Sequence, residues 1–129
     1  MQGEVGLYII NANGTNSTRI YDEFVYQSSF SINNKIAFIP SEYDNFNWSK
    51  QLFTINPDGT GLQQLTFLDS NCDHPSWSSD GTKIVFTIFN DETFEDIYII
   101  DSNGQNMNPV SIEGPGSNVF RELNPVWSR

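Results

Sequence analysis

The sequence has little positive charge, a single cysteine and a single histidine. It contains 6 Lys and Arg residues against 16 Asp and Glu residues, which gives a formal net charge of −10 at pH 7. A chain this acidic repels the phosphates of nucleic acids and of anionic membranes, so neither is an expected partner. The lone cysteine, Cys72, excludes a disulfide within the chain. The lone histidine, His74, is not accompanied by a Gly-x-Ser-x-Gly motif, so we expect no intrinsic enzyme activity.

Long apolar runs and helical periodicity are also missing. No apolar run reaches the roughly 18 residues of a transmembrane helix. The first residues, MQGEVG, lack the basic and apolar regions of a signal peptide. Aromatic residues make up 14% of the chain and stand in short runs with β-branched neighbours, which favours strands. We therefore expect an all-β domain that does not insert into a membrane.

Three segments of the chain repeat one another. They are GLYIINANGTN at 6–16, QLFTINPDGTG at 51–61 and DIYIIDSNGQN at 96–106, and their turn glycines are Gly14, Gly59 and Gly104, 45 residues apart. Each segment predicts a strand that ends in a tight turn, with glycine at the position that favours a positive φ. A second strand is expected after each turn.

A second motif alternates with the first. It is clearest in HPSWSSDGTKIVF at 74–86, and it recurs in part at 124–129 and, with Phe30 in place of Trp77, at 28–38. Asp-Gly or Asn-Asn between two apolar runs predicts a hairpin. The two motifs together give four short strands in about 45 residues, which is typical of a β-propeller blade.

The fold class predicted from these repeats is all-β, with propeller blades of four antiparallel strands. The chain would hold about three blades, half of a six-bladed propeller, in a single partial domain over 1–129. The expected blade units are approximately 1–24 together with 123–129, then 25–68, then 73–112. One blade cannot bury both faces of its sheet, so neighbouring blades must stack.

The pattern Pro-x-Trp-Ser-x-Asp-Gly-x-x-Ile-x-Phe, followed by Asp-Ile-Tyr-Ile-Ile-Asp and a Gly turn, resembles the repeat of TolB-type β-propellers. The match is strongest over 73–106. The resemblance implies a ring of blades around a channel, a periplasmic or other extracytoplasmic location, and a role in protein binding or as a recognition domain fused to a hydrolase. Three blades cannot easily close a ring. Either two chains join head-to-tail as a homodimer, or the chain is a fragment of a larger propeller.

The candidate binding residues lie in the loops at one end of the blades. The resemblance implies that Asp73 and His74, just before Pro-x-Trp, lie at the channel mouth. Carboxylates with aromatic anchors suit a basic or amphipathic protein or peptide partner. An acidic loop face is also what an acidic chain shows without any function. The candidates are Asp69, Asp73, His74, Tyr43, Trp48, Asp91, Glu92, Glu95 and Asp96.

No cofactor is expected. Asp69, Cys72, Asp73 and His74 are a dense group of metal-ligand residue types, but their spacing matches no zinc pattern. No DxDxDG-like loop is present, which leaves a calcium ion as a weaker alternative. The function we predict is a non-catalytic protein-binding propeller module. The alternatives are an accessory part of a larger hydrolase or peptidase, or a carbohydrate- or cation-binding propeller with Tyr43 and Trp48 as a sugar platform.

Overall fold

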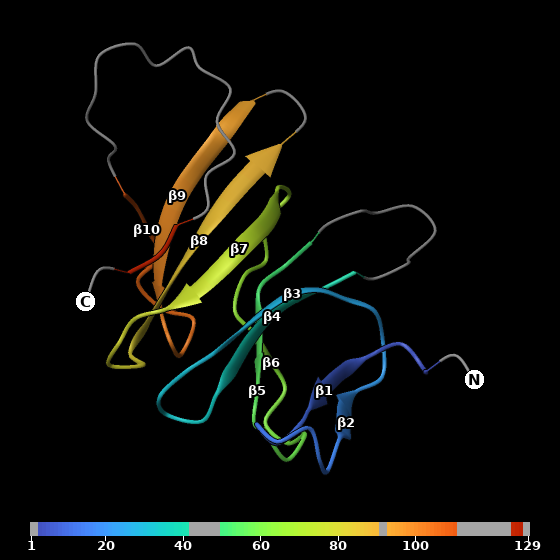
Figure 1. Ribbon diagram of the computed structural model, residues 1–129. Coiled ribbons are helices and arrows are strands. Elements are labelled where there is room, and N and C mark those ends of the chain that lie inside the picture. The colour runs from blue at the N-terminus through green and yellow to red at the C-terminus, as the bar shows by residue number, and fades with distance from the viewer. Residues whose placement is uncertain (1–2, 42–49, 91–92, 111–124, 128–129) are drawn as a thin grey trace.

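The computed structural model describes residues 3–41, 50–90, 93–110 and 125–127, with the backbone alone at 90 and 93–95. Every regular element in these residues is a β-strand, and no helix long and apolar enough to cross a membrane occurs among them. The strands form three antiparallel sheets that follow one another in chain order (Figure 1). The strands are β1 (Leu7–Ile9), β2 (Thr18–Tyr21), β3 (Val25–Phe30), β4 (Ile36–Pro40), β5 (Phe53–Ile55), β6 (Gln63–Gln64), β7 (Asn71–Trp77), β8 (Lys83–Asn90), β9 (Thr93–Asp101) and β10 (Asn108–Pro109).

Two of the three sheets are four-stranded meanders. In one, β3, β4, β5 and β6 pair in chain order, and in the other β7, β8, β9 and β10 do so. The third sheet contains β1 and β2 alone among the described residues. The predicted all-β class and its units of four antiparallel strands are therefore confirmed.

The turns of the first repeat share one hydrogen-bond pattern. In the Asn11–Thr15 turn, the Asn11 N–H donates to the Thr15 carbonyl over 2.9 Å, and the Asn13 side chain accepts from the Thr15 N–H over 3.1 Å. The turns at 56–60 and 101–105 repeat both bonds. The φ angles of their glycines are +81°, +84° and +86°, which confirms the predicted positive φ. Asn or Asp serves equally well at the accepting position because both offer the same side-chain oxygen.

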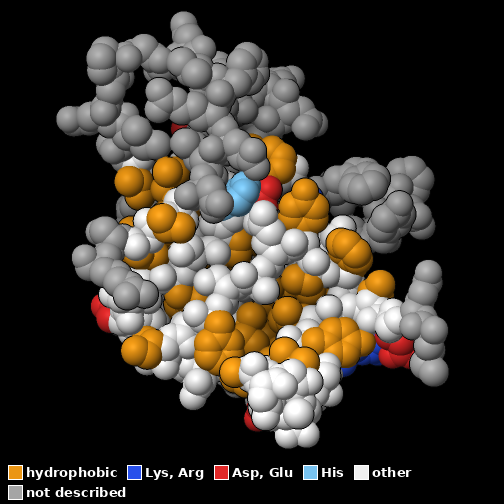
Figure 2. Space-filling model, in the orientation of Figure 1, with side chains coloured by type: hydrophobic (Ala, Val, Ile, Leu, Met, Phe, Trp, Pro, Cys, Tyr) orange, Lys and Arg blue, Asp and Glu red, His pale blue; other side chains and the backbone are white. Residues whose placement is uncertain are grey.

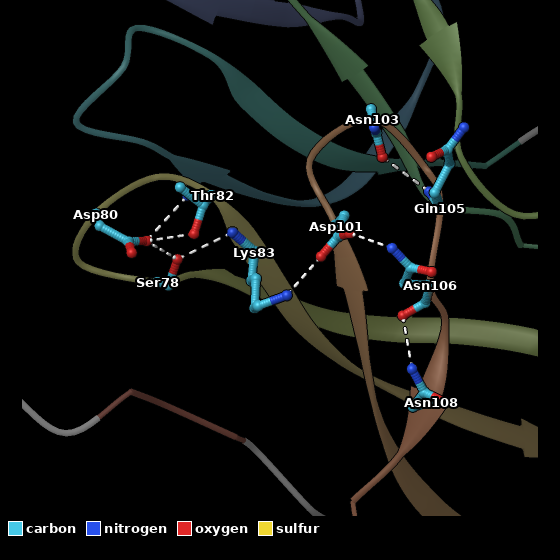
Figure 3. A network of polar contacts seen from close by, with 9 residues as sticks. All are labelled: Ser78, Asp80, Thr82, Lys83, Asp101, Asn103, Gln105, Asn106 and Asn108. Atoms are coloured by element: carbon cyan, nitrogen blue, oxygen red, sulfur yellow. Dashed lines mark hydrogen bonds and ion pairs between the residues drawn. The ribbon is translucent and has the colours of Figure 1, made fainter.

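The hairpin turn between β7 and β8 is held by Asp80 (Figure 3). Its carboxylate accepts hydrogen bonds from the hydroxyls of Ser78 and Thr82, at 2.7 Å each, and from the Thr82 N–H. The Ser78 and Thr82 hydroxyls stabilise the charged form and lower the pKa of Asp80 to about 2. Beside this turn, the ammonium of Lys83 on β8 lies 2.5 Å from the carboxylate of Asp101 on β9. These acids are therefore occupied in holding the turn end of the sheet.

The core lies between successive sheets. One cluster joins the β3–β6 sheet to the β7–β10 sheet and includes Leu52, Leu65, Trp77, Phe86 and Ile100. A smaller cluster joins the β1–β2 pair to the β3–β6 sheet. Trp77 is only 7% exposed, so it fills the space between two blades as its position in the repeat predicts. Face-to-face stacking of this kind lets each sheet bury an apolar face that it could not bury alone.

Candidate functional site

The β2–β3 and β6–β7 loops, the last residues of β4 and β8 and the first residues of β5 and β9 all lie at one end of the sheets, which we call the rim (Figure 1). Four predicted site residues, Tyr43, Trp48, Asp91 and Glu92, lie outside the described residues. Glu95 falls on β9, but its side chain is also outside them. The predicted site residues whose side chains the structure describes are Asp69, Asp73, His74 and Asp96. Aromatic residues lie beside them.

Asp73 and His74 form a bulge in β7. The register between β7 and β8 shifts between Asp73 and Ser76, and His74 has a φ of +50°. Its N–H donates to Oε1 of Gln27 on β3 over 2.6 Å and to Oδ1 of Asp73 over 3.0 Å. A non-glycine residue in this backbone region costs about 1–3 kcal/mol, which the surrounding hydrogen bonds must offset. The bulge therefore sits where the inner strands of two sheets meet.

The side chains of the bulge are only partly accessible. Asp73 is buried, and Nδ1 of His74 lies 4.0 Å from Oδ2 of Asp73. Figure 2 shows the histidine reaching the surface beside an acidic side chain, with hydrophobic side chains close by. The pair thus presents a small polar patch rather than an open pocket.

The polar residues at 69–74 do not converge on one point. Asp69 is exposed in the β6–β7 loop, whereas Cys72 is fully buried in the core with its sulfur 3.5 Å from the Thr66 hydroxyl. Burial raises the pKa of the Cys72 thiol to about 11, so it is protonated and a poor nucleophile at neutral pH. Within the described ranges, no three His, Cys, Asp or Glu side chains are grouped as a metal site.

Exposed aromatic residues accompany the acids of the rim. Phe24, Tyr26 and Phe67 are 54%, 52% and 79% exposed. The ammonium of Lys50 lies 3.6 Å from the centroid of the Tyr26 ring, and 5.9 Å from that of Phe89 in the next sheet. Sequence reasoning missed this contact because Lys50 and Tyr26 are far apart in the chain and no motif links them. The contact shows that rim aromatics can hold a cation.

A second concave feature lies at the opposite end, where the turns are. It is an open cleft of about 610 Å³ between the end of β1 and the turns of the next sheet. Nothing in the sequence pattern predicted it. The lining residues are Ile9, Phe30, Asn33, Asn34, Asn56, Pro57 and Asp58.

Comparison with known proteins connects this architecture to propellers. No protein-family model matches the chain. Dipeptidyl-peptidase 5 of Porphyromonas gingivalis is 45% identical over 38 residues, which are 30% of this chain and 6% of that protein. The structure of a putative TolB from Agrobacterium tumefaciens matches with a TM-score of 0.67 and 19% identity, covering 79% of this chain and 39% of the other. The tricorn protease structure matches at 0.57 and 21% identity, covering 84% of this chain and 10% of that one.

These matches span well under two thirds of the known proteins, and the structural ones share little sequence. They establish the arrangement of strands and not an activity. The repeated sheets, their stacking and this likeness agree with the resemblance of the sequence motif. The chain has the fold of part of a TolB-type β-propeller.

Proposed function

We propose that this chain is a non-catalytic binding module that takes a basic or amphipathic peptide or protein segment at the rim. The observation that carries the proposal is the combination of three exposed aromatic residues, Phe24, Tyr26 and Phe67, with the exposed carboxylates of Asp22, Glu23 and Asp69 at the same end of the sheets. Large aromatic residues supply most of the binding energy at many interfaces, and carboxylates select cationic partners. The partial ring brings loops from successive sheets to one end, where a segment can contact several of them.

The proposal is tested by neutralising charge at one end of the sheets at a time. The rim variant carries Asp69→Asn and Asp96→Asn, both at exposed positions. The matched control carries Asp58→Asn and Asp80→Asn at the turn end, where Asn13 and Asn33 hold the equivalent positions of other repeats. The probe is a fluorescent peptide rich in lysine and leucine, followed by anisotropy. Each exposed charge contributes about 0.2–1 kcal/mol, so the rim variant should bind several-fold more weakly, and less so at high salt.

The result that would count against the rim is equal loss of affinity in the two variants, which would indicate attraction to the net charge alone. An unchanged affinity in the rim variant would also count against peptide binding at the rim. Thermal unfolding of both variants checks that each remains folded.

The similarity to a peptidase favours a second function, as an accessory part of a larger hydrolase. The 45% identity to part of dipeptidyl-peptidase 5, together with the likeness to the tricorn protease, supports a chain that belongs to the propeller of a larger hydrolase. The catalytic residues would then lie outside this chain. Reading the genomic sequence around the coding region tests this directly, because a Gly-x-Ser-x-Gly-bearing domain in the same protein would decide for it.

The proposed binding module can obtain the remaining blades of its ring in two ways. In one, two copies of the chain join as a homodimer, and in the other the remaining blades come from a longer propeller. Multi-angle light scattering distinguishes a 14.7 kDa monomer from a species of twice that mass. An extracytoplasmic location is part of the same proposal, and fractionation of the source cells would test it.

A further inference from the structure

The β1–β2 pair is the outer half of a unit that is complete in the other two sheets. β1 aligns with β5 and β9, and its turn makes the same backbone hydrogen bonds as theirs. The inner neighbour of β5 is β4, and that of β9 is β8. Among the described residues, β1 pairs only with β2. Within the described part of the chain, the edge of β1 opposite β2 has no neighbouring strand, so its backbone N–H and C=O groups can pair with a further strand.

The β1–β2 pair is seated on the next sheet as a complete sheet would be. A Cβ placed on Gly59, in the turn of the β3–β6 sheet, would lie 3.4 Å from the Ile20 carbonyl of β2. One placed on Gly104, in the turn of the β7–β10 sheet, would lie 3.4 Å from Leu65 just after β6. The two outer strands of each sheet therefore pack against the next sheet in the same way. It follows that the space beside β1, on the side opposite β2, is where a complete sheet has its two inner strands.

The 610 Å³ cleft occupies this place. It runs between Ile9 at the end of β1 and Phe30 at the end of β3. Phe30 is 58% exposed, whereas Trp77, its counterpart on β7, is 7% exposed because the inner strands of the β3–β6 sheet cover it. Figure 2 shows hydrophobic side chains gathered on the lower part of the visible face. The exposed ring of Phe30 could therefore pack against inner strands like those that cover Trp77.

The inner strands of neighbouring sheets are joined by a hydrogen bond that recurs along the chain. This bond indicates which kind of strand could bind in the cleft. The indole N–H of Trp77 donates to the Ser29 carbonyl over 3.1 Å, and that of Trp127 donates to the Ser76 carbonyl over 2.9 Å. Each serine directly precedes the aromatic residue of its own strand, Phe30 or Trp77. An aromatic residue of one inner strand therefore covers the backbone of the inner strand before it. Phe30 is the remaining member of this series in the chain.

We infer that the cleft binds a β-hairpin supplied in trans, whose first strand carries Pro-x-aromatic and whose second carries Ile-x-Phe. The first strand covers Phe30, and the second pairs with the free edge of β1, as β8 pairs with β9. The alternating apolar residues of the second strand would extend the small core between the β1–β2 pair and the β3–β6 sheet. This site is at the turn end and is independent of peptide binding at the rim.

The chain itself provides the probe, a synthetic peptide of residues 73–88 that carries the whole β7–β8 hairpin motif. Its labelled form is titrated with the 129-residue protein and followed by fluorescence anisotropy, beside a scrambled peptide of the same composition. An isolated hairpin is marginal in water, so circular dichroism should also show a gain of strand signal on binding. We expect saturable binding of the hairpin peptide and none of the scrambled one.

Three variants locate the binding. Phe30→Asp should weaken it about tenfold or more, because a charge would be buried under the first strand. Phe30→Trp should tighten it, because an indole N–H could donate to the Ser76 carbonyl of the peptide as Trp127 does in the chain. Ile32→Asp is the matched control: Ile32 is 73% exposed, and its counterpart Ser79 stays exposed in the complete sheet, so affinity should not change.

The proposal is overturned if the wild-type chain binds the hairpin and scrambled peptides equally, or if Phe30→Asp and Ile32→Asp have the same effect. A homodimer on size exclusion that does not bind the peptide would assign the cleft to a second copy and overturn it as well. Because these variants change exposed residues, their unfolding curves should match that of the wild type, and this is measured alongside.

Discussion

The described residues form two contacts between sheets that are built from the same repeat and buried to different extents. In the closed seam, between the β3–β6 and β7–β10 sheets, Trp77 is 7% exposed and donates a hydrogen bond across the contact. In the open seam, between the β1–β2 pair and the β3–β6 sheet, the equivalent Phe30 is 58% exposed. The same motif position thus contributes to stability in one seam and is free to bind in the other. What a repeat residue does depends on the strand that covers it.

Truncating the two aromatic residues should separate the seams most clearly. Trp77→Ala should lower the free energy of unfolding by about 3–5 kcal/mol, because it leaves a large cavity in the closed seam. Phe30→Ala should change it by less than about 1 kcal/mol, because the ring is already mostly in water. Urea unfolding of both variants measures the difference. Equal losses would show that the two seams are alike in solution.

Exchanging the aromatic type sharpens the comparison. Trp77→Phe gives the closed seam the residue that the open seam has, and it removes the indole N–H that bonds the Ser29 carbonyl. We expect a loss of about 1 kcal/mol from the hydrogen bond, plus a smaller packing loss. A loss as large as that of Trp77→Ala would mean that the hydrogen bond, rather than the buried area, dominates this seam.

A pH series tests the turn beside the closed seam. Since the folded-state pKa of Asp80 is depressed to about 2 from 3.8, its contribution to stability is present above pH 3.8 and is lost as the pH falls through 2. Wild type and Asp80→Asn should therefore differ most at pH 5 and least near pH 2. The measurement is urea unfolding of both proteins at each pH. A difference that does not change with pH would mean that the charge of Asp80 is not what holds the turn.

The smallest expected effect is that of metal removal. With no metal-ligand set predicted, EDTA should leave the melting temperature unchanged, and added calcium should do the same. A calcium-dependent rise would instead favour a cation-binding propeller and would place the ion in loops that the sequence marks as acidic.

The strands and turns were predictable from the sequence because they follow local rules. Gly14, Gly59 and Gly104 lie where a tight turn requires a positive φ, which glycine adopts without steric cost. Trp77 was predictable for a related reason, since its place in the repeat determines which face of the strand it occupies. Sequence periodicity therefore predicts the four-stranded sheets and the burial of Trp77 between two of them.

The site was less predictable because it depends on contacts between distant segments. Asp69 and Asp73 are close in sequence, yet Asp69 is exposed in the β6–β7 loop whereas Asp73 is buried at the bulge of β7. The cleft beside Phe30 exists because, among the described residues, no inner strands lie beside β1. No sequence motif in the chain predicts this. Tyr43, Trp48, Asp91 and Glu92 remain predictions outside the described residues.

Lys50 has a consequence for any ligand of the rim. Its ammonium already covers the face of Tyr26 and lies near Phe89, so this lysine behaves as an internal substitute for a bound cation. Under the proposed function, an incoming lysine or arginine must displace it or settle on a neighbouring aromatic residue. If the rim binds as proposed, its apparent affinity for cationic segments is set partly by one of the chain's own side chains, which competes for the same aromatic faces.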